Sequence, residues 1–100
     1  MEKKYIANGV RWFDKANGNT YHSVRITRVK DNKTIYCPFQ YGYDDMYRQT
    51  ALKAMLKAGW LPKKYNDSNL YSYERENNYT IYWTVSDGLK RDCIANGFNY

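Results

Sequence analysis

The sequence predicts an α+β two-layer sandwich, in which an antiparallel five-stranded sheet carries two helices on one face in the order β-β-β-α-β-β-α. Three observations predict it. Apolar and polar residues alternate in several short segments, turn residues such as Asn and Gly separate these segments, and one segment has the three-and-four spacing of an amphipathic helix. With both helices on one face, the other face of the sheet is expected to be open to a partner.

Residues 4–14, 20–29 and 33–40 are the first three predicted strands. Asn17-Gly18 joins the first two, because Asn and Gly both tolerate the positive φ angles of a tight hairpin turn. Asp31-Asn32 is the next turn signal, and it separates the second strand from the third.

The alternation assigns side chains to faces. Val10 and Trp12 share one face of the first strand, and Phe39 is expected to share a face with Ile35 and Cys37. The side chains expected to face the helices are Val24, Ile26, Ile35, Cys37, Ile81 and Trp83. Pro38 cannot donate a ladder hydrogen bond, so the third strand should lie at an edge of the sheet or end there.

One helix is predicted over residues 45–58. Asp44 or Asp45 can accept hydrogen bonds from the N–H groups that open it, and Gly59 provides a left-handed stop. The apolar stripe of this helix consists of Tyr47, Ala51, Leu52, Met55 and Leu56.

A second hairpin and a short helix complete the prediction. Residues 70–76 and 79–86 are expected to pair around Asn77-Asn78. Ser86 can cap the short final helix, which Asn96-Gly97 ends. Leu89, Cys93 and Ile94 are expected to point inward from it.

Composition limits the classes of function. The chain has 100 residues, which is the length of one domain (1–100), and it contains 16 Lys and Arg, 10 Asp and Glu and 12 Tyr. A core of this size cannot hide so many hydroxyl-bearing rings, so several should lie at the surface beside cations. The net charge of +6 favours anionic partners.

Cysteine usage and the absence of apolar runs predict a cytoplasmic protein. Cys37 and Cys93 lack CxxC spacing and are expected to be reduced and buried. Neither a signal peptide nor a membrane span is predicted, so no membrane partner is expected. The sequence does not fix whether the chain is a monomer or a dimer.

The sequence gives no support for an enzyme, a cofactor or a metal site. The single histidine, His22, lies inside a predicted strand without a second His or a Cys cluster to assist it, so a structural or surface role is expected. Asp44-Asp45 is better explained as the start of a helix than as half of a cation site.

The stronger signal is a set of aromatic and basic residues on the sheet face that the helices leave open. Its members are Tyr21, Arg25, Tyr36 and Tyr82, together with Arg11. Rings can stack on bases while guanidinium groups pair with phosphates, and the same residue types dominate protein interfaces. A third alternative is a cross-strand aromatic ladder that stabilises the sheet.

A second group of basic residues lies along the long predicted helix and in the segment after it. It consists of Lys53, Lys57, Lys63 and Lys64, and it is expected to be a solvated face or part of a binding surface. The RNA-recognition signature of a basic residue, a glycine and aromatic residues on one strand is absent from residues 79–86.

Residues 13–24 (FDKANGNTYHSV) and 39–43 (FQYGY) resemble segments of small uncharacterised proteins of bacteriophages and mobile elements. The resemblance covers roughly the first 60 residues and carries no active site. It implies a phage product that acts inside a bacterial cell, where small proteins without enzymatic motifs often block host defences, as anti-CRISPR proteins do.

The leading hypothesis is a binding protein that inhibits a host nucleoprotein effector, such as a CRISPR nuclease, by occupying a protein or RNA-binding surface. Arg25, Tyr36 and Tyr82 would be contact residues. The alternatives are direct binding of RNA or single-stranded DNA, and a structural or assembly component of a phage.

Overall fold

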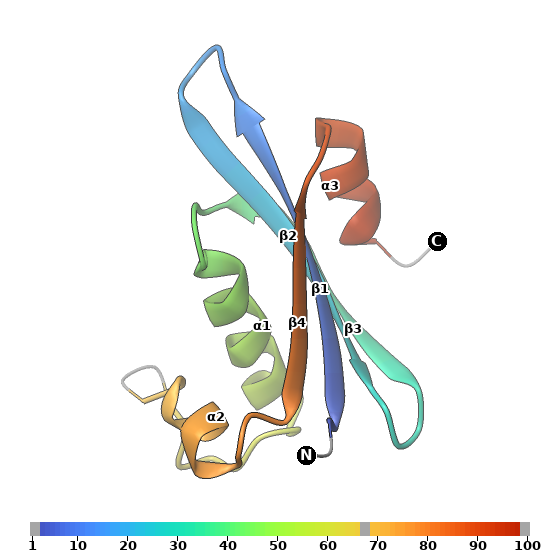
Figure 1. Cartoon of the computed structure of the whole chain (residues 1–100), viewed down its shortest axis with the longest axis vertical. Coiled ribbons are helices and arrows are strands. Elements are labelled where there is room, and N and C mark those ends of the chain that lie inside the picture. Colours follow the sequence, from blue (N-terminus) through green and yellow to red (C-terminus); the bar gives the residue numbers. More distant parts are fainter. Residues whose placement is uncertain (1–2, 67–68, 99–100) are drawn as a thin grey trace.

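A computed structural model describes residues 3–66 and 69–98 of the chain. Within these ranges four strands and three helices form an α+β fold, which confirms the predicted class (Figure 1). The elements are β1 (Tyr5–Asp14), β2 (Asn19–Arg28), β3 (Lys33–Tyr41), α1 (Met46–Lys57), α2 (Ser72–Glu76), β4 (Ile81–Asp87) and α3 (Lys90–Asn96).

The sheet has the order β3-β2-β1-β4 and is mixed. The β1–β2 and β2–β3 pairs are antiparallel, whereas β4 runs parallel to β1. The prediction of five antiparallel strands was therefore wrong. The prediction that residues 33–40 lie at an edge is confirmed, because β3 is an outer strand and Pro38 lies within it.

The missing fifth strand is the helix α2. Residues 70–76 alternate well enough to resemble a strand, but Leu70 and Tyr73, three residues apart, are both buried. Short apolar runs fit both periods, and here packing decides between them. The Trp83 Nε1–H donates a hydrogen bond to the carboxylate of Glu74 at 2.7 Å, which ties α2 to β4.

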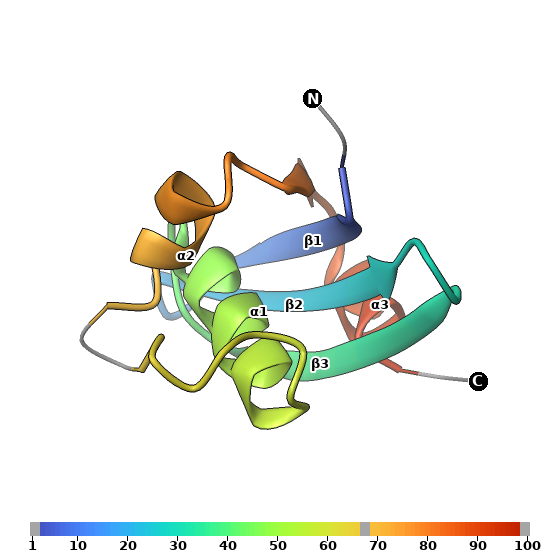
Figure 2. The ribbon, with the colours of Figure 1, turned by 90° about the horizontal axis from the view of Figure 1, so that it is seen from below.

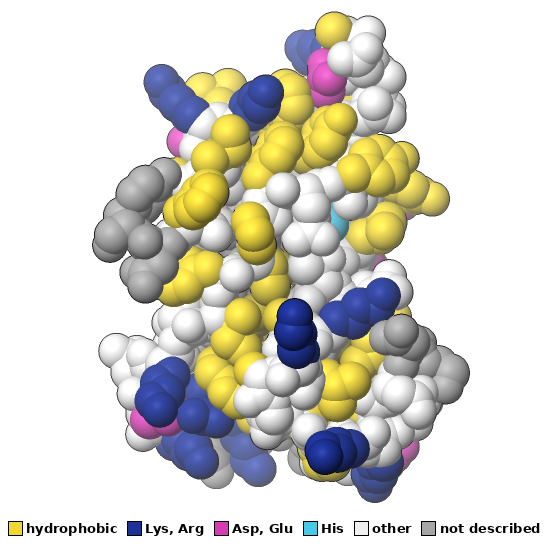
Figure 3. Space-filling model, turned by 180° about the vertical axis from the view of Figure 1, so that it is seen from behind, with side chains coloured by type: hydrophobic (Ala, Val, Ile, Leu, Met, Phe, Trp, Pro, Cys, Tyr) yellow, Lys and Arg dark blue, Asp and Glu magenta, His cyan; other side chains and the backbone are white. Residues whose placement is uncertain are grey.

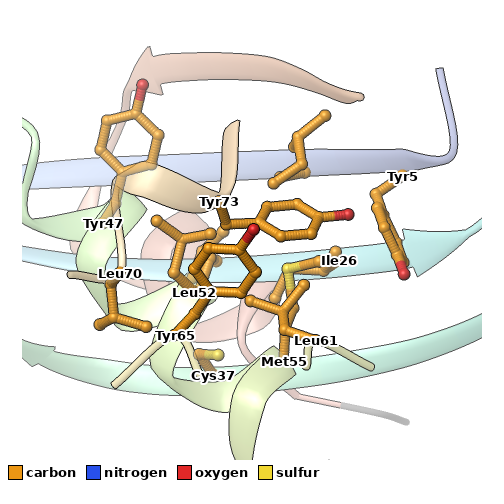
Figure 4. Packing of buried hydrophobic residues seen from close by; sticks show 14 residues of the cluster. Tyr5, Ile26, Cys37, Tyr47, Leu52, Met55, Leu61, Tyr65, Leu70 and Tyr73 are labelled. Carbon is orange, nitrogen blue, oxygen red and sulfur yellow. The ribbon is translucent and has the colours of Figure 1, made fainter. Parts of the chain in front are cut away.

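The main core lies between α1 with its following loop and one face of the sheet (Figure 4). The predicted stripe of α1 is confirmed, since its buried residues are Tyr47, Ala51, Leu52 and Met55. Gly59 has a φ of +79°, as a left-handed stop requires. Asp45 is the N-cap residue, as predicted, but its side chain accepts no capping hydrogen bond, so that part of the prediction was wrong.

The final helix α3 lies on the opposite face of the sheet from α1 (Figures 1 and 2). The prediction of two helices on one face, with the other face open, was therefore wrong. Ser23 donates its hydroxyl to the carbonyl of Cys93, and Asn96 donates its side-chain amide to the carbonyl of Asn8 at 3.0 Å. Because these contacts are polar, no apolar stripe in the sequence of α3 indicates which face of the sheet the helix covers.

The start of α3 also differs from the prediction. Ser86 belongs to β4, and the helix begins after Leu89, whose N–H donates to the Asp92 carboxylate at 3.1 Å. Cys93 is buried as predicted, whereas Leu89 is exposed. Cys37 and Cys93 are both free and buried, as expected from the sequence.

No helix in the described parts of the chain is long and apolar enough to cross a membrane.

His22 is buried between the sheet and α1. Its Nδ1 lies 3.1 Å from the Gly42 carbonyl, to which it donates, and its Nε2 lies 2.8 Å from the Thr50 hydroxyl. Desolvation lowers the pKa of His22, because burial penalises the imidazolium, although the Gly42 carbonyl opposes this shift. The histidine therefore has a structural role here.

We expect the free energy of unfolding to fall as the pH is lowered from about 7.5 to about 5.5. The unfolded histidine, with a pKa of about 6.5, takes up a proton in this window before the folded one does. Urea titrations across the window measure the slope. His22 is the only histidine, so the His22→Gln variant should lose that slope; an equal slope in both proteins would contradict the prediction.

Candidate aromatic binding surface

The structure brings together only part of the predicted set. Tyr21, Arg25, Tyr36 and Tyr82 do share one face of the sheet, the face on which α3 lies. Arg11 points to the α1 side, where it pairs with Asp87 at 3.1 Å and donates to the Asp44 carbonyl at 3.3 Å. Its expected place on the open face was therefore wrong.

Arg25 is engaged by α3. Its Nε donates to the Asn96 carbonyl at 2.9 Å and a terminal nitrogen donates to the Ala95 carbonyl at 3.3 Å. The guanidinium carbon of Arg25 lies 5.1 Å from the centroid of the Tyr36 ring. Arg25 therefore satisfies carbonyls at the end of a helix, where a positive charge is favourable, and Tyr36 packs against it.

Replacing Arg25 with methionine is expected to lower the free energy of unfolding by about 1 kcal/mol, because the Asn96 carbonyl loses its donor and the Ala95 carbonyl keeps only its backbone donors. The matched control is Arg91→Met, which removes an exposed guanidinium from the same helix and should change stability by less than about 0.5 kcal/mol. Urea denaturation measures both variants. Equal stability of the two variants would mean that Arg25 does not hold the end of α3 and could instead contact a partner.

Four rings from three strands form a cluster that we call the aromatic patch: Trp12, Tyr21, Phe39 and Tyr41. Tyr21 is at its centre. It stacks on Phe39 with centroids 4.9 Å apart and planes at 10°, and on Trp12 with centroids 5.7 Å apart. Tyr41 meets the Tyr21 ring edge-on at 5.9 Å and is 55% exposed. Hydrophobic side chains accordingly gather in the upper half of Figure 3.

A β-bulge places Phe39 in the patch. Val24 pairs with Cys37 but His22 pairs with Gln40, so β3 has an extra residue at this point. The bulge turns Phe39 away from the face of Ile35 and Cys37 and against Tyr21. The predicted face of Phe39 was therefore wrong. Pro38, which cannot donate a ladder hydrogen bond, was the signal in the sequence that could have indicated the break.

Charges of both signs surround the patch. The Lys90 Nζ lies 5.4 Å from the centroid of Trp12 and 6.0 Å from that of Phe39, at the start of α3. A neighbouring hollow of about 760 Å³ shares Trp12 with the patch. Its other lining residues include exposed apolar side chains, two cations and three carboxylates: Phe13, Leu89, Arg11, Lys15, Asp44, Asp87 and Asp92.

The remaining predicted site residues lie apart from the patch. Tyr82 is 53% exposed on the outer strand β4. The second basic group, Lys53, Lys57, Lys63 and Lys64, is exposed along α1 and the loop after it. Lys64 pairs with Glu76 at 3.5 Å. Sequence reasoning missed four members of a site, because only the pairing of β1, β2 and the bulged β3 and the position of α3 bring them together: Trp12, Phe39, Tyr41 and Lys90.

No protein-family model matches the chain, and no curated protein or solved structure matches it. The resemblance of residues 13–24 and 39–43 to phage proteins thus stays a prediction. The function is inferred from the chemistry of the surface.

Proposed function

We propose that this chain is a non-catalytic binding protein whose aromatic patch docks on a protein. The observation that carries the proposal is the stack of Trp12, Tyr21 and Phe39 across three strands, with the exposed Tyr41 at its margin. Aromatic rings held by their neighbours lose little conformational entropy on binding, and Tyr and Trp dominate the binding energy of protein interfaces.

The charges beside the patch favour a protein over a nucleic acid at this surface. The adjoining hollow is lined by Asp44, Asp87 and Asp92, and their carboxylates repel phosphate. Its Arg11 already pairs with Asp87. An apolar centre with a rim of both charge signs is typical of a protein interface.

The partner class follows from the expected phage setting. We propose that the patch occupies a surface of a host-defence nucleoprotein effector, such as a CRISPR nuclease, and thereby inhibits it. The phage resemblance of residues 13–24 and 39–43 supports this partner, as does a sequence in which no catalytic motif is found. The same rings can also act as a cross-strand ladder that stabilises the sheet. A ring that packs against its neighbour with one face can contact a partner with the other.

Inhibition assays with purified effectors test the proposal. DNA cleavage by single-protein and multi-subunit CRISPR effectors is measured with increasing amounts of the protein and of two variants. Tyr41→Ser with Phe39→Ser removes two rings of the patch, and we expect inhibition to weaken by at least about 30-fold, the loss of a binding hot spot. The control, Tyr71→Ser with Tyr79→Ser, removes two exposed rings elsewhere and should weaken inhibition by less than about 3-fold.

Two results would contradict the proposal. Failure of the protein to inhibit any effector in the panel would overturn the partner class. Equal inhibition by the patch variant and the control variant would overturn the assignment of the patch.

A further inference from the structure

Positive side chains gather at the end of the molecule opposite the aromatic patch. Most of the Lys and Arg side chains visible in Figure 3 lie in its lower half, where β1 begins and α1 ends. The carboxylates of Asp44, Asp87 and Asp92 line the hollow at the other end. The chain therefore has two chemically different ends, and the basic end has no part in the function proposed above.

A cavity of about 440 Å³ lies at this basic end, and we call it the basic pocket. Four cations from two separate segments line it together with two aromatic residues: Lys3, Lys4, Arg28, Lys30, Tyr5 and Trp60. The β1–β2 pairing brings the segments together, since Tyr5 is opposite Arg28 and the Val29 N–H donates to the Lys4 carbonyl at 3.0 Å. No carboxylate lines this cavity among the described residues.

The wall of the basic pocket is held in place. The Arg28 guanidinium carbon lies 4.6 Å from the centroid of Trp60, and Tyr5 stacks on the same indole at 5.7 Å and 17°. Arg28 also donates two hydrogen bonds to Asp31, at 3.0 and 2.7 Å. Asp31 therefore pairs with Arg28 and not with a lysine. The positive charge that is free to attract an anion is that of Lys3, Lys4 and Lys30.

The lysines themselves are exposed at the mouth of the pocket. Lys3 donates to the carbonyl of Tyr79 at 2.7 Å, a contact that orients its ammonium group without neutralising it. Lys4 and Lys30 are exposed as well. Like charges held together raise the free energy of the unbound protein, and a bound anion removes that repulsion.

We propose that the basic pocket binds phosphate groups of single-stranded nucleic acid. Lysine ammonium groups bind phosphate as point charges, and the half-buried Trp60 indole, on which the buried Tyr5 ring stacks, offers an aromatic surface to an unpaired base. The cavity has the size of sites that take one small ligand, which suits a single nucleotide unit. The pocket and the aromatic patch lie at different ends, so either proposal can fail without the other.

The test measures binding of a fluorescein-labelled 12-nucleotide oligothymidylate by anisotropy in about 50 mM NaCl, where phosphate contacts are strong. The pocket variant is Lys3→Gln, Lys4→Gln and Lys30→Gln. The matched control is Lys15→Gln, Lys53→Gln and Arg91→Gln, which removes the same charge from exposed positions outside the pocket. Unfolding curves of both variants check that they remain folded.

We expect the pocket variant to bind the oligonucleotide at least about 10-fold more weakly than the control variant. The slope of log affinity against log salt concentration should be shallower by about 2 in the pocket variant, since three phosphate contacts are lost. Equal losses in the two variants would show attraction by net charge alone and overturn the proposal. Failure of the unchanged protein to bind the oligonucleotide would also overturn it.

Competition distinguishes the source of the anion. Unlabelled oligothymidylate should displace the labelled strand far better than inorganic phosphate or polyglutamate does at matched ionic strength. Equal displacement by inorganic phosphate, counted per phosphate, would make free phosphate the ligand and overturn the nucleic-acid assignment. Equal displacement by polyglutamate would make the pocket a site for acidic peptides and overturn it as well.

Discussion

Replacing Leu52 with alanine is expected to lower the free energy of unfolding by about 2–5 kcal/mol, the range for large-to-small changes in a closed core. Leu52 is 0% exposed and lies in the cluster between α1 and the sheet (Figure 4). Alanine has the higher helix propensity, so any measured loss reflects packing and not the stability of the helix itself. Urea denaturation followed by circular dichroism measures the change.

The control is Leu89→Ala, the same chemical change at a side chain that is 55% exposed. It should alter the free energy of unfolding by no more than about 0.5 kcal/mol. A small effect of Leu52→Ala, comparable with that of the control, would mean that α1 does not cover the core as described. A changed dependence on urea would instead indicate a looser folded or unfolded state.

The elements that the sequence predicted correctly are those with a strong local pattern. The stripe of α1 repeats over several turns, and only a helix places Tyr47, Ala51 and Met55 on one side. The first hairpin turns where Asn17-Gly18 indicated, but its turn covers residues 15–18, and only Gly18, with a φ of +69°, has the positive φ predicted for both residues. Such features depend on the local sequence, so they could be predicted without knowing which distant residues pack against them.

The features that were missed depend on contacts between distant residues. Residues 70–76 fit two periods, and the burial of both Leu70 and Tyr73, the latter against Tyr65 in the loop after α1, selects the helix. The face taken by α3 is set by hydrogen bonds to Ser23 and Asn8, which have no periodic signature. A β-strand at a sheet edge leaves the chain free to continue over either face.

The candidate site shows the same division. Alternation correctly placed Tyr21 and Arg25 on one face, but it could not show that α3 would engage Arg25. The bulge at Pro38 then brought Phe39 to Tyr21. The surface that is left for a partner is therefore the part of this face beyond α3, and not the whole open face that the sequence predicted.

Replacing Gly97 with alanine is expected to lower the free energy of unfolding by about 3 kcal/mol, because α3 could no longer lie against the sheet. A Cβ at Gly97 would lie 2.8 Å from the Cys37 carbonyl oxygen and 2.8 Å from the Pro38 Cα. Both are backbone atoms, so the contact can be relieved only by moving β3 or the end of α3. Urea denaturation measures the loss.

Gly88→Ala is the matched control at the other end of α3. A Cβ there would have ordinary contacts, the nearest at 3.4 Å, so stability should be unchanged or higher by up to about 1 kcal/mol. A second measurement follows the Cys93 thiol, whose pKa is raised chiefly by its burial between α3 and the sheet. Brief maleimide labelling should modify Cys93 faster in Gly97→Ala than in Gly88→Ala, while Cys37, on the α1 side, stays protected. Equal stability and equal labelling of the two variants would mean that α3 does not cover this face.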